Sequence, residues 1–79
     1  MITVYTYFMF QRRYSTPEAG TYYSYDIAVY GPLYRRPVRV VRDVSTNGCL
    51  VYRMIILFNE KSLSPIHLLD AIQDFLSME

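Results

Sequence analysis

Residues 63–77 constrain the fold more than any other segment, because they have the pattern of a single amphipathic helix. Ser64 can accept a hydrogen bond from a free N–H of the first turn. Pro65 suits the first helical position, since its missing N–H is not needed there. Five large apolar side chains fall in one stripe: Leu68, Leu69, Ile72, Phe75 and Leu76. We expect this stripe to be buried against the rest of the chain.

The chain is small and unusually apolar, which indicates that it associates with something. Its 79 residues suffice for one domain, and a chain of this length buries only about 60–65% of its unfolded surface. Hydrophobic residues make up 52% of the sequence, and nine Tyr and four Phe exceed what a thin core can enclose. We therefore expect a homodimer at micromolar concentration, with residues 22–34 or the outer face of residues 49–58 in the contact.

Charge and hydropathy exclude several classes of protein. The formal net charge of +1 argues against a strongly basic nucleic-acid binder and against an acidic DNA mimic. The longest apolar run, residues 49–58, is interrupted by Arg53 and is shorter than the ~20 residues that span a membrane. The N-terminus lacks the basic and apolar regions of a signal peptide. We expect a soluble, cytoplasmic protein that does not bind membranes.

Cys49 is the only cysteine, so an intrachain disulfide is impossible and a reducing compartment fits the sequence. It lies in an apolar run without a neighbouring histidine. The sequence therefore predicts a small buried hydrophobic residue rather than a nucleophile.

The first half of the chain has the composition of three strands. Residues 2–10 and 21–30 are rich in β-branched and aromatic residues, and residues 38–44 alternate valine with arginine. Residues 11–20, which include Pro17 and Gly20, have the polarity of a connecting loop. Short connections between successive strands favour an antiparallel meander.

Residues 45–59 allow two interpretations. Asn47-Gly48 between β-rich flanks is a strong hairpin signal, which would make residues 49–58 a fourth strand. Alternatively, Ser45 or Thr46 caps a helix that pairs with the final one. The sequence thus predicts an α+β fold. Its form is either a three-stranded antiparallel sheet with a C-terminal helical hairpin or four strands plus one C-terminal helix.

A resemblance bears on this choice. The string Asp43-Val44-Ser45-Thr46, the apolar positions that follow it and the string Leu63-Ser64-Pro65-Ile66-His67-Leu68 resemble a family of short bacterial proteins known only as a domain of unknown function. The similarity covers residues 21–77. It implies that residues 46–59 form the first arm of a helical hairpin, and it brings no activity, cofactor or catalytic residue.

Catalytic and metal-binding patterns are weak in this sequence. His67, Asp70 and Asp74 share the polar side of the last helix, a position that a solvated helix face explains without a metal. One histidine, no G-x-S-x-G string and three scattered glycines provide neither an acyl-transfer nor a phosphate-binding site. We expect no enzyme activity, no metal and no cofactor.

Tyrosine and arginine alternate through the middle of the chain and indicate a binding surface. The candidate partner-binding residues are Tyr22, Tyr25, Tyr30, Tyr34, Arg35, Arg36, Arg39 and Arg42. These residue types are enriched at protein interfaces, so we expect a small protein-interaction or regulatory module. An inhibitor of a larger enzyme, such as a phage or mobile-element anti-defence protein, belongs to this class. The alternative is a module that stacks the bases of single-stranded nucleic acid on its aromatic side chains.

Overall fold

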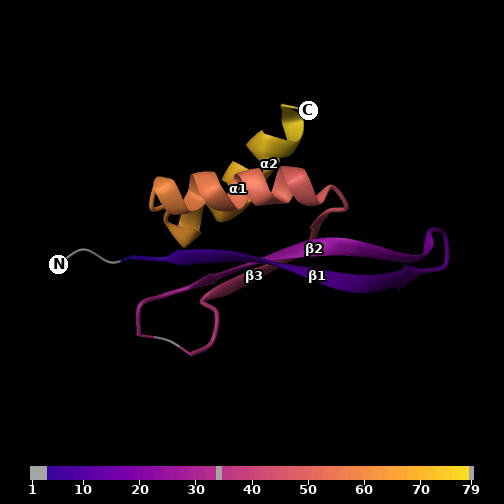
Figure 1. Cartoon of the computed structure of the whole chain (residues 1–79), viewed down its shortest axis with the longest axis horizontal. Coiled ribbons are helices and arrows are strands. Elements are labelled where there is room, and N and C mark those ends of the chain that lie inside the picture. Colours follow the sequence, from indigo (N-terminus) through magenta and orange to yellow (C-terminus); the bar gives the residue numbers. More distant parts are fainter. Residues whose placement is uncertain (1–3, 34, 79) are drawn as a thin grey trace.

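The computed structural model describes residues 4–33 and 35–78, and it shows a three-stranded antiparallel sheet followed by two helices (Figure 1). The strand order is β1-β2-β3, so β2 is central. The elements are β1 (Thr6–Thr16), β2 (Gly20–Tyr30), β3 (Arg39–Ser45), α1 (Gly48–Glu60), the 3₁₀ turn η1 (Pro65–His67) and α2 (Leu68–Ser77). The α+β prediction with three strands is confirmed, and the alternative with a fourth strand is wrong.

The predicted loop at residues 11–20 is the largest error of the sequence analysis. β1 continues to Thr16, where it pairs with Gly20, and only three residues separate the two strands. Gly20 adopts a φ of 70°, and the Ala19 N–H donates to the Thr16 hydroxyl at 3.0 Å, which together close a tight turn. Polar residues do not end β1 because most of its side chains beyond Phe10 are exposed to water.

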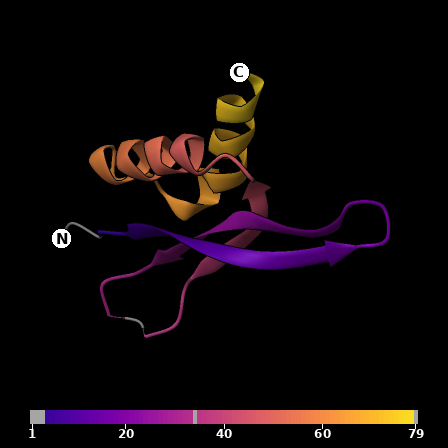
Figure 2. The same ribbon diagram turned by 45° about the vertical axis from the view of Figure 1, so that its right-hand side comes forward.

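β3 pairs with only part of β2. Its partners run from Val29 to Tyr25, with a register shift between Ile27 and Tyr25. Asp43, which lies within this irregular stretch, has a φ of 53°. Residues 20–24 therefore pair with β1 alone. With residues 12–19 they form a two-stranded arm that extends past the helices (Figures 1 and 2).

Asn47 and Gly48 begin α1 instead of forming a hairpin turn. The Asn47 side chain accepts a hydrogen bond from the Leu50 N–H at 3.2 Å, which caps the helix. Gly48 leaves room for Tyr25, since a Cβ there would lie 2.9 Å from its ring. Asn47 thus caps the helix, and Gly48 lets its first turn pack on the sheet.

The last helix begins differently from the prediction. Pro65 opens the turn η1, and the Ser64 side chain makes no capping hydrogen bond. The Ser64 carbonyl instead accepts from the His67 N–H at 2.9 Å. In Figures 1 and 2, α2 then crosses α1 steeply and points away from the sheet. Two helices are confirmed, whereas the predicted hairpin geometry is not.

One core lies between the sheet and the helices. It contains Tyr7, Ile27, Val29, Leu50, Val51, Met54, Ile55, Phe58, Leu68 and Ile72. Phe58 contacts both layers, since its ring centroid lies 5.5 Å from Tyr7 and 6.3 Å from Phe75.

Three predictions of burial are wrong. Leu69 and Leu76 belong to the expected stripe of α2 but are exposed, because a narrower side of this helix contacts the core. Cys49 is exposed as well, since it follows Gly48 at the first turn of α1, on the side away from the core. In the part of the chain that the structure describes, neither helix has the length and hydropathy needed to cross a membrane.

Candidate interaction surface

The sheet has one face that no helix covers, because α1 and α2 both lie on its other side (Figure 1). The β1–β2 register places the even-numbered residues of both strands on this uncovered side, and Val40 joins them through its pairing with Ala28. We call this surface the open face. Its residues are Thr6, Phe8, Phe10, Arg12, Tyr14, Tyr22, Ser24, Asp26, Ala28, Tyr30 and Val40.

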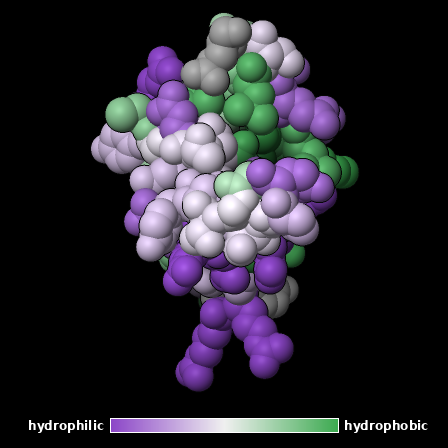
Figure 3. Space-filling view, turned by 90° about the vertical axis from the view of Figure 1, so that its right-hand side faces the viewer, coloured by the Kyte–Doolittle hydropathy of each residue, from purple (hydrophilic) through white to green (hydrophobic). Residues whose placement is uncertain are grey.

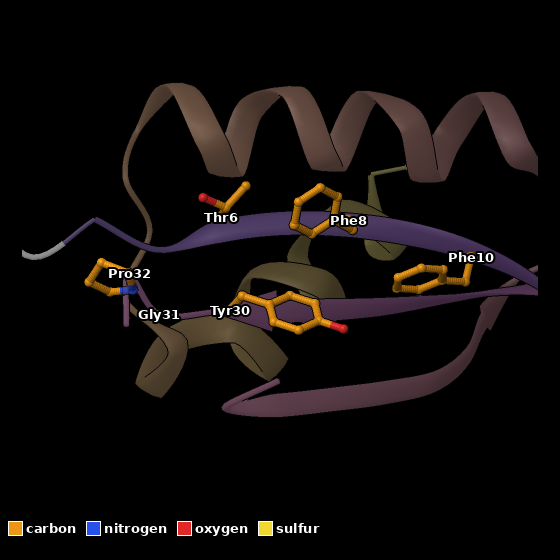
Figure 4. A pocket seen from close by; sticks show the side chains of 6 residues that line it. All are labelled: Thr6, Phe8, Phe10, Tyr30, Gly31 and Pro32. Carbon is orange, nitrogen blue, oxygen red and sulfur yellow. The ribbon is translucent and has the colours of Figure 1, made fainter. Parts of the chain in front are cut away.

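One end of the open face is apolar and aromatic. Phe8 and Phe10 are 45% and 47% exposed, and the Phe8 ring meets Tyr30 edge-on with centroids 5.6 Å apart. A shallow groove of about 550 Å³ runs among these side chains, Thr6, Gly31 and Pro32 (Figure 4). A second hollow of about 250 Å³ adjoins it and shares Phe10 and Tyr30. The first groove is mainly apolar, and the second leads from it to the polar side chains of Arg12 and Asp26.

The other end of the open face is a polar network centred on Asp26. This carboxylate is 2% exposed, and it accepts hydrogen bonds from the Tyr14 hydroxyl and, at 3.0 Å, from the Asp43 N–H. The Arg12 Nε lies 3.0 Å from its second oxygen. A buried charge needs such partners, so Asp26 holds Arg12 and Tyr14 in fixed positions.

Two stacked tyrosines extend this network. The rings of Tyr14 and Tyr22 lie 5.8 Å apart, and the Tyr22 hydroxyl donates to Asp43 Oδ2 at 2.6 Å. The hydroxyls of Ser24 and Tyr22 lower the pKa of Asp43. The hydrogen bond to Asp43 in turn raises the pKa of Tyr22. Both shifts favour the ionised acid beside the neutral phenol at neutral pH.

The structure divides the predicted partner-binding residues among several places. Tyr22 and Tyr30 lie on the open face, while Tyr25 lies on the helix side against Gly48. The four arginines of the prediction are exposed: Arg35 and Arg36 in the β2–β3 loop, and Arg39 and Arg42 in β3. Tyr34 lies outside the described residues.

Sequence reasoning missed the contribution of β1. Phe8, Phe10, Arg12 and Tyr14 all belong to the open face, yet the expected end of the strand at Phe10 hid the last two. No local pattern could have found them, because three apolar residues, Phe8 to Phe10, are followed by three polar ones, Gln11 to Arg13.

The helices carry a second group of exposed apolar side chains. Tyr52 and Ile56 of α1 are 58% and 41% exposed, and Ile66 is 76% exposed. Figure 3 faces the end with the β1–β2 turn and shows hydrophobic atoms gathered high on the molecule, at the level of the helices. The hollow found among helical residues, lined by Leu50, Arg53, Phe75 and Met78, measures only about 120 Å³.

The sequence predicts no metal site at His67, Asp70 and Asp74, on the polar side of the last helix. Among residues 4–33 and 35–78, no three His, Cys, Asp or Glu side chains lie close enough together to hold a metal ion.

Comparison with protein families finds a match. The model of a family of unknown function, DUF6514, matches residues 2–78. No curated protein and no solved structure matches the chain significantly.

Proposed function

The chain belongs to DUF6514, a family of unknown function, and we propose that it is a non-enzymatic module that binds a protein partner through the open face. Inhibition of a larger enzyme, the anti-defence role considered above, is one form of this function, and the partner's identity would decide it. The proposal places the protein in the cytoplasm, where the exposed thiol of Cys49 stays reduced.

The observation that carries the proposal is the exposed aromatic end of the open face. Phe8, Phe10 and Tyr30 surround a groove on a sheet face that no helix covers. Exposed aromatic clusters of this kind are typical of the central part of protein interfaces. The ordered Arg12 and Tyr14 beside them supply polar groups whose positions are fixed before binding, which lowers the entropic cost of association.

The test begins with capture of a partner from host cytoplasm and proceeds to affinity measurements with that purified partner. We expect Phe10→Ala to weaken binding at least about tenfold, as for an aromatic side chain at the centre of an interface. The fold should survive, because Phe10 is half exposed.

Leu69→Ala is the matched control, since Leu69 is 42% exposed but lies on α2, on the other side of the sheet. It should bind as the wild type does. Unchanged binding by Phe10→Ala, or equal weakening by both variants, would rule out the open face as the docking surface.

A second candidate function is binding of single-stranded nucleic acid. The aromatic rings of Phe8, Phe10 and Tyr30 could stack on bases, with the exposed arginines of β3 and the preceding loop beside phosphates. The net charge of +1 and the pairing of Arg12 with Asp26 favour a protein partner instead.

Salt dependence separates the two candidates. Binding of a labelled single-stranded oligonucleotide should fall steeply with salt and weaken further in Arg39→Ala and Arg42→Ala. If no oligonucleotide binds at low salt, the nucleic-acid candidate is excluded.

A further inference from the structure

The outer edge of β1 is closed at one position by a helix side chain. The Tyr7 N–H donates to Asn59 Oδ1 at 2.8 Å, and Asn59 Nδ2 donates to the Tyr7 carbonyl at 3.1 Å. A neighbouring strand would make the same two contacts. Asn59, at the end of α1, thus occupies the place of a strand at Tyr7.

This contact shows which N–H and carbonyl groups of β1 point away from β2. Because the Tyr7 N–H and carbonyl point away from β2, those of Met9, Gln11, Arg13 and Ser15 point the same way. Among the described residues, these outward groups form no hydrogen bond with another element. Met9 is half-buried, and the other three residues are exposed.

Both ends of this open segment are defined. Asn59 blocks it before Met9, and Pro17, which has no N–H, follows soon after Ser15. The arm beyond Gln11 extends past the helices, so a strand can approach it from the side (Figure 2). Residues 9–15 are therefore a short edge suited to an extended backbone.

We infer that a second copy of this chain occupies the edge. Two β1 strands pair antiparallel about a two-fold axis at Arg12, so that Met9 faces Ser15 of the second copy and Gln11 faces its Arg13. In this register all four outward residues of each strand form hydrogen bonds, which gives about eight between the two backbones. The blocked positions, Tyr7 and Pro17, take no part. It stands apart from the proposed docking function, because its hydrogen bonds come from the backbone edge of β1.

The side chains of the segment suit this register. On the open face, Phe10 lies opposite Tyr14 of the second copy, an aromatic cross-strand pair. Gln11, on the helix side, can accept a hydrogen bond from Arg13 of the second copy. The two Arg12 side chains meet near the axis, and each is already paired with its own Asp26 at 3.0 Å, which limits their repulsion.

The dimer would have a larger open face than the monomer. The two-fold axis runs perpendicular to the sheet, so the helices of both copies lie on the same side of it. The two three-stranded sheets then form one continuous sheet. The bare arm of each copy then lies beside the helix-covered half of the other.

Sedimentation equilibrium of the full chain tests the inference with two variants at one position. Gln11→Pro removes an outward N–H that β2 does not use, so it should fold but dimerise at least about tenfold more weakly, since each dimer loses two edge hydrogen bonds. Gln11→Ala keeps the N–H and should dimerise like the wild type. A wild-type monomer at ~100 µM, where ordinary affinities give a dimer, or an unweakened Gln11→Pro dimer, would refute the inference.

Cysteine cross-linking tests the register without relying on proline. In a Cys49→Ser background, a mixture of Phe10→Cys and Tyr14→Cys chains should form a disulfide between the two variants on mild oxidation. Facing positions of antiparallel strands lie within the span of a disulfide. Phe10→Cys alone should not cross-link, because its own copies would be four residues apart along the strands. Equal cross-linking of Phe10→Cys with itself would contradict this register.

Discussion

Tyr7 is the residue that most directly joins the sheet to the segment before α2. It is 1% exposed, its ring packs edge-on against Phe58, and its hydroxyl donates to the Leu63 carbonyl at 2.8 Å. Burial and, to a smaller extent, the nearby Tyr5 raise the pKa of Tyr7 to about 12. The neutral phenol is thus the form that the folded state requires.

The first prediction follows from that pKa. Since the pKa of Tyr7 is higher in the folded state than in the unfolded state, its contribution to stability is complete below pH ~10 and is lost as the pH rises toward 12. Tyr7→Phe should lower the free energy of unfolding at pH 8 by about 1–2 kcal/mol, because the Leu63 carbonyl loses its donor.

Urea titrations at several values between pH 8 and pH 12 measure both effects. Stability should fall less steeply above pH 10 in Tyr7→Phe than in the wild type. Parallel curves for the two proteins would show that Tyr7 is not the titrating group.

Individual residues also explain where sequence reasoning failed locally. Asn47-Gly48 suits a hairpin turn and a capped helix start equally well, and the helix is distinguished by its packing on the sheet, for example by the contact of the Tyr25 ring with Gly48. That contact joins residues distant in the sequence, so no local pattern contains it. Cys49 was expected to be buried because its neighbours are apolar, yet its place in the first turn of α1 exposes it.

At the scale of elements, α2 is held mainly through one partly buried aromatic side chain and two buried aliphatic ones. Phe75 packs edge-on against Phe58, and Leu68 and Ile72 complete the contact with the core. Phe75→Ala should therefore cost about 2 kcal/mol, less than the 3–5 kcal/mol typical of a fully buried phenylalanine.

Leu69→Ala provides the comparison on the same helix, and its cost should stay below ~1 kcal/mol because Leu69 is 42% exposed. Urea denaturation of the two variants measures the difference. Equal costs would mean that α2 does not use the Phe75 side for packing.

Element type was easier to predict than element length. The β-branched and aromatic composition of residues 21–30 correctly identified β2 as a strand, and strand geometry alone then sends its alternate residues to a helix side and an open side. The extent of β1 was not predictable from polarity, since an arm with water on both sides tolerates Arg12 and Arg13 as readily as a loop does. That error removed Arg12 and Tyr14 from the predicted sheet surface.

For the whole molecule, the single core predicts cooperative unfolding. Buried residues of β1, β2, α1 and α2 belong to one contiguous cluster, which includes Tyr7 and Ile27 of the sheet and Leu68 and Ile72 of α2. Loss of either layer exposes the other, so the sheet and helices should unfold together.

Circular dichroism can follow the helices at far-ultraviolet wavelengths and the packing of tyrosines at near-ultraviolet wavelengths. The two signals should give the same midpoint in urea. A helical signal lost at lower urea would identify α2 as a separate, weaker unit.

The contact between Asn59 and Tyr7 has a consequence for solubility. An exposed strand edge is a template on which further chains can add without limit, as they do in fibrils, and the risk increases with its unbroken length. Asn59 shortens the usable edge of β1 by occupying the hydrogen-bonding groups at Tyr7. Because this amide is fixed to the end of α1, the edge is shielded only while the helix is packed on the sheet, and folding itself protects the chain from aggregation.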